Sequence, residues 1–137
     1  MKSWSALGGL MVLLASAYAH AEVAVIVHPS NANAISDEDI KSLFLGKRKA
    51  FPNGDEAVPI NLLVDSDVRN QFNVKALGKS ESQLKAYWSQ LLFTGKGVPP
   101  KEMAIPQVIS EVASNAKAIA YVDAAQVNSS VKVIMTY

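Results

Sequence analysis

Cysteine is absent from this sequence, and histidine is scarce, with His20 and His28 as its two examples. The missing thiols exclude a disulfide framework, a thiolate metal site, a cysteine nucleophile and a lipid anchor on a post-cleavage cysteine. The chain also contains neither a Gly-x-Ser-x-Gly elbow nor a Gly-x-x-x-x-Gly-Lys phosphate loop. We therefore expect a protein that is not an enzyme, with no catalytic residue, no metal site and no cofactor.

The first 21 residues have the parts of a secretory signal peptide in the usual order. Lys2 gives a positive start, "ALGGLMVLLASA" from Ala6 is a short apolar core, and Ala19 and Ala21 are the small residues that a signal peptidase reads. A bilayer span needs about 20 apolar residues, more than this core offers. We predict cleavage after Ala21 and an exported domain of residues 22–137 with no later membrane span. The alternative is an N-terminal membrane anchor.

Charge is balanced in the predicted mature domain. Removal of Lys2 takes the cations from 13 to 12, which equals the 12 acidic residues. A domain without net charge has no overall attraction for nucleic acid or for an anionic membrane. We therefore expect no nucleic-acid partner.

Apolar, β-branched segments alternate with amphipathic ones along residues 22–137. Strands are expected at Val23–Val27, Ala57–Val64, Ala118–Val122 and Val131–Met135. Helices are expected after Ser36, from about Asp67 to Leu77, after the capping-box pair Ser80 and Gln83, and at Pro106. This alternation predicts a single α/β domain, with a largely parallel or mixed sheet flanked by helices.

The helix after Ser80 has the strongest amphipathic pattern. Helical spacing predicts that its buried face consists of Leu84, Tyr87, Trp88, Leu91 and Leu92.

Three cations, Lys47 to Lys49, follow Gly46 directly. Gly46 comes just after the last apolar residue of the helix that begins at Ser36, where a left-handed cap is expected. Cations are favoured at the negative end of a helix dipole. We therefore interpret them as solvated charges at a helix end, with an anion site as the alternative.

Two loops are candidates for a ligand site, residues 28–34 after the first strand and residues 65–71 after the second. Ligands of α/β proteins lie beyond the carboxyl ends of strands, near helix N-termini whose free N–H groups bind anions. The predicted ligand-binding residues are Ser30, Asn31, Ser66, Asp67 and Arg69. The alternative is that Ser66 and Asp67 only cap a helix and that Arg69 is an exposed surface residue.

Three segments resemble a known family: "IKSLFLGKRKAFPNG" from Ile40, "LGKSESQLKAYWSQLLFTGKGVPP" from Leu77 and "VASNAKAIAYVD" from Val112. They are similar to phosphate-type periplasmic solute-binding proteins of ABC importers, and most closely to a short, single-lobe branch of that family. The resemblance implies one lobe of the type II periplasmic-binding fold, in which two α/β lobes close on an oxyanion. It also implies a periplasmic location and a phosphate-like anion as ligand.

The phosphate loop of this family has the form Arg-Ser-Asp-Gly-Ser-Gly-Thr, and residues 65–71 match it in part. Ser66 and Asp67 coincide with the motif, whereas Asp65 replaces its arginine and the Gly-Ser-Gly-Thr run is absent. An arginine returns one helical turn later, at Arg69, and Ala120 replaces the glycine of the last strand motif. The resemblance implies a module that binds a small oxyanion weakly or with a second chain. The alternative is a lobe without a ligand that docks on a membrane sensor or transporter domain.

Overall fold

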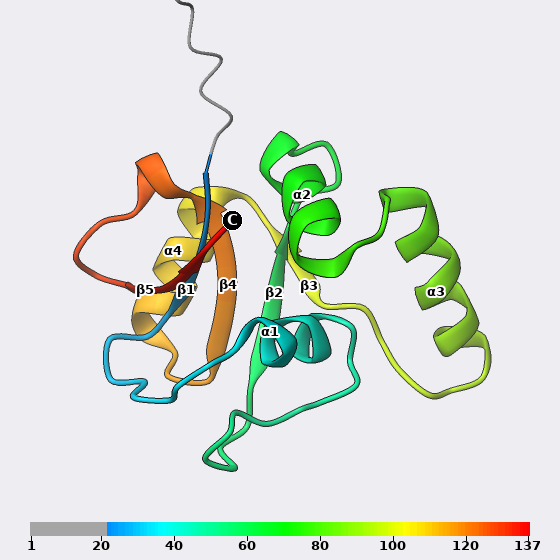
Figure 1. Ribbon diagram of the computed structural model, residues 1–137, viewed down its shortest axis with the longest axis horizontal. Helices are drawn as coiled ribbons and strands as arrows, with labels where there is room; N and C mark the ends of the chain where they lie inside the picture. The colour runs from blue at the N-terminus through cyan, green and yellow to red at the C-terminus, as the bar shows by residue number, and fades with distance from the viewer. Residues whose placement is uncertain (1–21) are drawn as a thin grey trace, which may run out of the picture.

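The computed structural model describes residues 22–137, so the predicted signal peptide lies outside the described residues. In this range one sheet has the strand order β3-β2-β4-β1-β5 (Figure 1). Its strands are β1 (Val23–Val27), β2 (Val58–Leu62), β3 (Lys101–Met103), β4 (Ala118–Asp123) and β5 (Lys132–Thr136). Strand β2 is parallel to β3 and β4, whereas β1 is antiparallel to β4 and β5. The predicted α/β class with a mixed sheet is confirmed.

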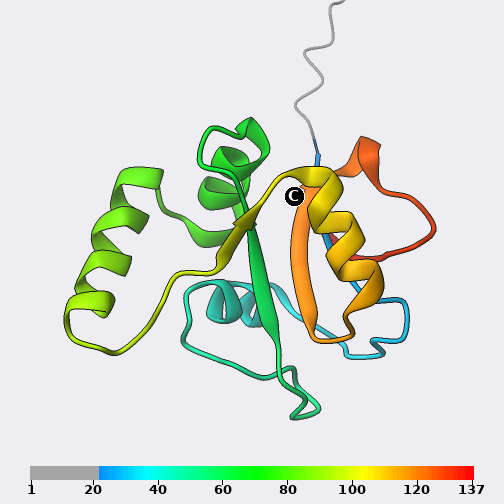
Figure 2. The same ribbon diagram turned by 180° about the vertical axis from the view of Figure 1, so that it is seen from behind.

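Helices cover both faces of this sheet (Figures 1 and 2). Helices α1 (Asp37–Phe44) and α2 (Asp67–Phe72) lie on one face, and α4 (Ile105–Ser114) lies on the other. Because both faces are covered, every residue of β1 is buried. Helix α3 (Glu81–Phe93) instead lies beyond the edge strand β3, at the side of the sheet.

An aromatic cluster joins α1 and α2 to the sheet. The rings of Phe72 and Tyr121 stack with centroids 3.8 Å apart, and Phe44 meets Phe72 edge-on at 4.8 Å. The Tyr121 hydroxyl donates a hydrogen bond to Oδ1 of Asn61 at 2.5 Å. Burial raises the pKa of Tyr121, so this hydroxyl stays protonated and keeps donating. The cluster thereby fixes α2 above the carboxyl end of β2.

The helix ends follow the predicted capping residues. Ser36 and Asp39 form the capping box of α1, and Gly46 adopts the left-handed conformation with φ 71°. Helix α2 continues into a π-helical turn, η1 (Asn73–Leu77), which ends at Gly78. The prediction of one helix from Asp67 to Leu77 therefore holds in extent, but the widened turn was not predicted.

Two expectations, about β2 and α3, are wrong in detail, and one strand was not predicted. Strand β2 ends at Leu62, two residues early, and Val64 is exposed. Strand β3 was not predicted because its three-residue sequence, Lys-Glu-Met, is short and mostly charged. Leu92 is 51% exposed although the helical pattern placed it in the core. Because α3 lies beyond the sheet edge, only a narrow face of it is buried, centred on Leu84 and Trp88.

The two ends of the described range meet where Val23 and Tyr137 exchange backbone hydrogen bonds of 2.9 and 2.8 Å. One continuous hydrophobic core lies between the sheet and its helices. Within residues 22–137, no helix has the length and apolar character that crossing a membrane requires.

Candidate functional site

The loop after β2 leads directly into the start of α2. Ser66 is the N-cap residue, and its hydroxyl accepts a hydrogen bond from the backbone N–H of Arg69 at 3.3 Å. The first N–H groups of a helix have no acceptor within the helix, so those of Asp67 and Val68 point out of its start. Ser66 is half-buried and Asp67 is exposed. This loop therefore offers a hydroxyl and backbone donors at the protein surface, with the carboxylates of Asp65 and Asp67 beside them.

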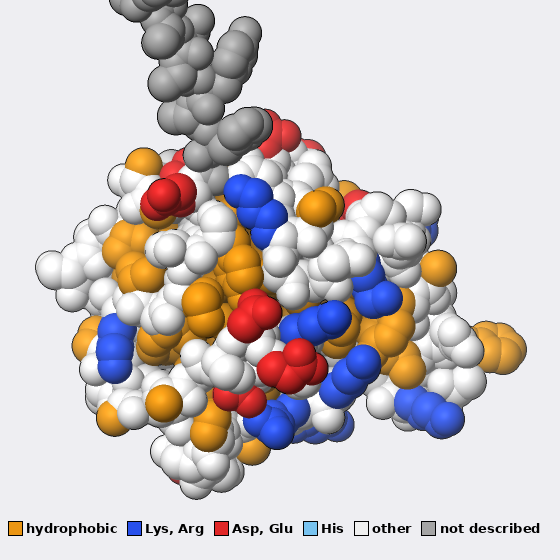
Figure 3. Space-filling view, viewed as in Figure 1, with side chains coloured by type: hydrophobic (Ala, Val, Ile, Leu, Met, Phe, Trp, Pro, Cys, Tyr) orange, Lys and Arg blue, Asp and Glu red, His pale blue; other side chains and the backbone are white. Residues whose placement is uncertain are grey.

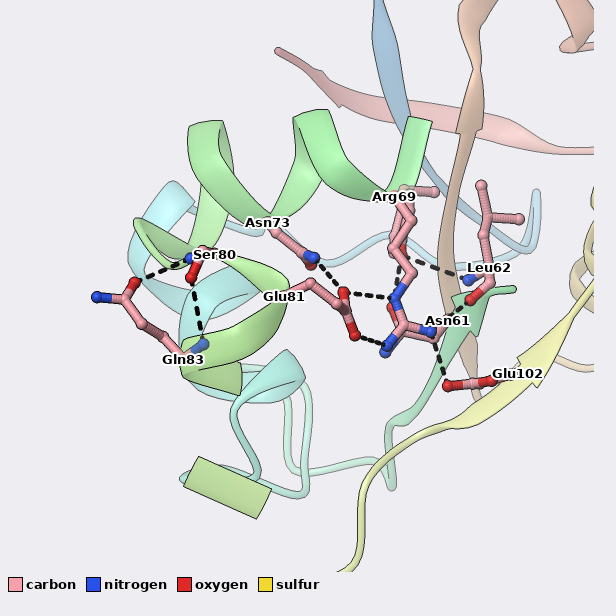
Figure 4. A network of polar contacts seen from close by, with 9 residues as sticks. Asn61, Leu62, Arg69, Asn73, Ser80, Glu81, Gln83 and Glu102 are labelled. Atoms are coloured by element: carbon pink, nitrogen blue, oxygen red, sulfur yellow. Dashed lines mark hydrogen bonds and ion pairs between the residues drawn. The ribbon is translucent and has the colours of Figure 1, made fainter. Parts of the chain in front are cut away.

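Arg69 lies beneath this loop with its guanidinium at the centre of a polar network (Figure 4). It donates to both carboxylate oxygens of Glu81, at 2.6 and 3.1 Å. It also donates to Glu102 at 2.7 Å and to the backbone carbonyl of Leu62 at 2.8 Å. One side chain thus connects the end of β2, the edge strand β3 and the start of α3.

Asn73 and the cap of α3 extend this network. The Asn73 amide donates to Glu81 at 2.7 Å, and Asn73 is buried. Ser80 and Gln83 form the predicted capping box just before Glu81 (Figure 4). Glu81 therefore stands in the first turn of α3, where the helix dipole favours a carboxylate.

The burial of Arg69 corrects the expectation of an exposed arginine. Its relative accessibility is 6%, and two carboxylates already neutralise it. Burial alone would lower the pKa of Arg69, but its hydrogen bonds to Glu102 and Glu81 outweigh that effect and raise the pKa. These partners could not be predicted from local patterns, because Glu81 and Glu102 lie 12 and 33 positions further along the chain.

The two candidate loops lie at opposite ends of the sheet. Strand β1 is antiparallel to β4, and β2 is parallel to β4, so the carboxyl ends of β1 and β2 point in opposite directions. Ser30 and Asn31 therefore lie far from Ser66, Asp67 and Arg69. The Ser30 hydroxyl lies 2.8 Å from Nδ1 of His28, and buried Asn31 accepts hydrogen bonds from Asn33. The structure brings together only the second group of predicted residues.

The remaining polar groups that the sequence singled out lie away from this loop. Lys47, Arg48 and Lys49 are exposed after the end of α1, as predicted, and Arg48 pairs with Asp39 at 2.5 Å. Within the described range, the Oε1 atom of Gln71 is the one buried side-chain polar atom without a hydrogen-bond partner. The same range contains no group of three His, Cys, Asp or Glu residues that could hold a metal ion.

A groove of about 380 Å³ lies between α3 and the body of the domain. Its walls include Phe44, Leu77, Leu84 and Trp88, and its polar end is formed by Arg69 and Glu102. The groove is mainly apolar, in contrast to the polar loop at Ser66.

This domain has the α/β fold of one periplasmic-binding-protein-like lobe. It is similar to a protein from Clostridium perfringens described as a phosphate ABC transporter substrate-binding protein, solved with bound phosphate. The TM-score is 0.65 and the identity 21%, over 83% of this chain and 45% of that one. This likeness confirms the phosphate-binding-protein-like fold that the sequence resemblance implied.

Two further solved structures have the same fold. An ABC-type phosphate transport receptor from Vibrio cholerae matches with a TM-score of 0.65 and 16% identity, over 83% of this chain and 46% of that one. PstS from Borrelia burgdorferi matches with a TM-score of 0.57 and 13% identity, over 83% of this chain and 47% of that one. The chain thus spans slightly less than half the length of these proteins. No family model matches the sequence, and no curated protein sequence matches it.

Proposed function

We propose that this chain is an exported, periplasmic solute-binding module that binds a small oxyanion such as phosphate and has no catalytic activity. The observation that carries this proposal is the placement of Ser66 and Asp67 at the start of α2, in a lobe with the fold of phosphate-binding proteins. Ser66 and Asp67 also coincide with the phosphate loop of the family that the sequence resembles.

Each group at the loop has a distinct proposed role. The Ser66 hydroxyl and the first N–H groups of α2 donate hydrogen bonds to the anion. Asp67 accepts a hydrogen bond from a protonated oxygen, since a carboxylate repels an oxyanion that carries no proton. Arg69, already paired with two carboxylates, holds the loop from beneath through its bond to the Leu62 carbonyl. The proposed site therefore selects a partly protonated anion.

Affinity is proposed to be weak for this lobe alone. The neighbouring solved proteins are about twice as long as this chain, which covers 45–47% of each. In the family that the sequence resembles, the anion is enclosed between two lobes. We infer that a second chain completes the site, because an exposed loop leaves the anion largely in water and makes each hydrogen bond weaker.

Thermal melting of the polypeptide of residues 22–137 tests anion binding. Phosphate at 100 times its dissociation constant stabilises a folded protein by about 2.7 kcal/mol. We expect phosphate to raise the melting temperature more than potassium chloride of equal ionic strength does. Ser66→Ala is expected to remove this rise, whereas Ser30→Ala at the opposite end of the sheet keeps it. An equal response to chloride and phosphate contradicts the proposal.

Export is proposed from the residues 1–21 and is tested separately. The form recovered from a periplasmic extract is expected to begin at Glu22 when sequenced from its N-terminus. Recovery of a chain that begins at Met1 in the membrane fraction contradicts cleavage.

The apolar groove beside α3 favours a second candidate function. Here the lobe serves as an adaptor that docks on a periplasmic domain of a membrane sensor or permease and needs no ligand. A pull-down with the polypeptide of residues 22–137 distinguishes the two functions when combined with the melting experiment. Partner capture that is unaffected by phosphate, together with no phosphate-specific stabilisation, favours the adaptor.

A further inference from the structure

Hydrophobic side chains protrude at the C-terminal tip of α3. Phe93 is 93% exposed, Val98 76% and Leu92 51%. Gly95, in the left-handed conformation with φ 68°, turns the chain between them. Single exposed hydrophobic residues are common on protein surfaces, but these three occur within seven positions at one projecting end. The tip therefore presents an apolar group to its surroundings instead of burying it.

Lysines surround this tip from three parts of the chain. Lys49 and Lys96 line a hollow beside α3 together with Trp88 and Val98, and Lys101 lines the adjoining hollow with Lys49. Within residues 22–137, no salt bridge involves Lys49, Lys96 or Lys101. Figure 3 shows Lys and Arg side chains between α1 and α3, next to hydrophobic side chains, with Asp and Glu side chains beside them toward the centre of the view. The two hollows beside the tip have no Asp or Glu in their lining, so the surface at the tip is locally cationic.

The charge and the shape of this surface restrict its occupant. A second copy of the chain would bring the same lysines against these, and like charges repel across an interface. A projecting apolar side chain can insert into the apolar layer of a bilayer, whereas a flat protein surface offers no space for it. Lysine side chains around such a residue lie at the depth of lipid headgroups, where their ammonium groups meet phosphates.

We propose that the tip surface, defined as Leu92, Phe93 and Val98 with Lys49, Lys96 and Lys101, docks on an anionic lipid bilayer. Phe93 inserts below the headgroups, and the lysines bind the phosphates above it. Val58 and Pro59, at the start of β2, line one of the hollows, whereas Ser66 follows the end of β2. The tip surface is thus separate from the proposed anion loop, and lipid docking does not depend on phosphate binding.

Co-sedimentation with lipid vesicles tests the proposal on the polypeptide of residues 22–137. We expect binding to vesicles of equal parts phosphatidylglycerol and phosphatidylcholine, and little binding to phosphatidylcholine alone. Each lysine near an anionic surface contributes about a fivefold factor to partitioning, so Lys49→Ala with Lys96→Ala is expected to weaken binding about 25-fold. Phe93→Ser is expected to weaken it about tenfold, because the inserted ring is lost.

A matched control tests whether the position of the changes matters. Val74 and Lys75 are an exposed apolar residue and an exposed lysine on η1, outside the tip surface. The variant with Val74→Ser and Lys75→Ala is expected to bind as the unchanged protein does. Since all the substituted side chains are exposed, circular dichroism melting is expected to show every variant folded.

Three results overturn the proposal. The first is equal binding to both kinds of vesicle, and the second is binding that is insensitive to Phe93→Ser and to the lysine changes. The third is the absence of vesicle binding; if polyglutamate then binds through the same lysines, the surface is assigned to an acidic protein. Phosphate titration of the same variants is expected to be unchanged, so failure of lipid docking is distinguishable from failure of anion binding.

Discussion

The guanidinium of Arg69 binds both carboxylate oxygens of Glu81, twelve residues away, at 2.6 and 3.1 Å. This two-point contact fixes the start of α3 against the start of α2 (Figure 4). Helix α3 lies beyond the edge of the sheet, so the contact is one of the few that hold it to the domain. Arg69 therefore has a structural role that its position near a helix start did not suggest.

Arg69→Ala is expected to lower the free energy of unfolding by about 2–3 kcal/mol. Removing one partner of a buried ion pair costs about 3–5 kcal/mol, and the solvent access of Glu81 and Glu102 reduces this figure here. Arg69→Lys keeps the charge but not the two-point geometry. Its free energy of unfolding is therefore expected to lie between those of the unchanged protein and Arg69→Ala. Urea denaturation measures the difference. A change within about 0.5 kcal/mol, the range of surface substitutions, would contradict the network.

The α/β architecture could be predicted from the sequence, but the strand at the edge of the sheet and the relative strand directions could not. Capping boxes, glycine stops and buried strands depend on neighbours in the chain, so the caps of α1 and α3 were predicted correctly. The direction of β1 relative to β2 depends on long-range pairing, which local sequence patterns do not reveal. The predicted site therefore combined Ser30 and Asn31 with residues at the other end of the sheet.

Trp88→Ala is expected to cost about 3 kcal/mol, because the side chain is buried against the domain. Leu92→Ala, on the same helix, is expected to change stability by less than about 0.5 kcal/mol, since Leu92 is exposed. Thermal unfolding of the two variants measures which face of α3 is buried. Equal losses for both would mean that α3 is rotated relative to this structure.

Gly46→Ala is expected to destabilise the domain more than Gly95→Ala does. Both glycines have positive φ, at 71° and 68°, so an alanine meets backbone strain of about 1 kcal/mol at either position. At Gly46 the added methyl group would also lie 3.0 Å from the Trp88 ring, whereas Gly95 has open space around it. Denaturation of both variants, and of Gly46→Ala with Trp88→Phe, isolates this contact. Equal costs at the two glycines would show that the contact is absent.

Ionised Asp39 is expected to stabilise the folded domain, so the free energy of unfolding falls when acid protonates it. The pKa of Asp39 is held below its usual value of 3.8, chiefly by a hydrogen bond from the backbone N–H of Ser36. The Ser36 side chain and the Arg48 guanidinium lower this pKa further. Because the folded state favours the ionised form, this stabilisation is present above about pH 4 and is lost as the pH falls through the folded pKa. Asp39→Asn is expected to cost about 0.5–1 kcal/mol at pH 7 and nothing at pH 2. If Asp39→Asn lowers the free energy of unfolding equally at both pH values, the loss comes from side-chain shape and not from the charge of Asp39.

The proposed anion loop is tested most directly by a phosphate titration of the ¹⁵N-labelled polypeptide of residues 22–137, followed by NMR. Backbone amide signals report each residue separately, so the titration locates the site as well as detecting it. We predict saturable shifts concentrated at Ser66 to Arg69, absent with chloride at equal ionic strength and lost in Ser66→Ala. Shifts confined to residues 28–34 or to Lys47–Lys49, or no saturable shift at all, would contradict an anion site at Ser66.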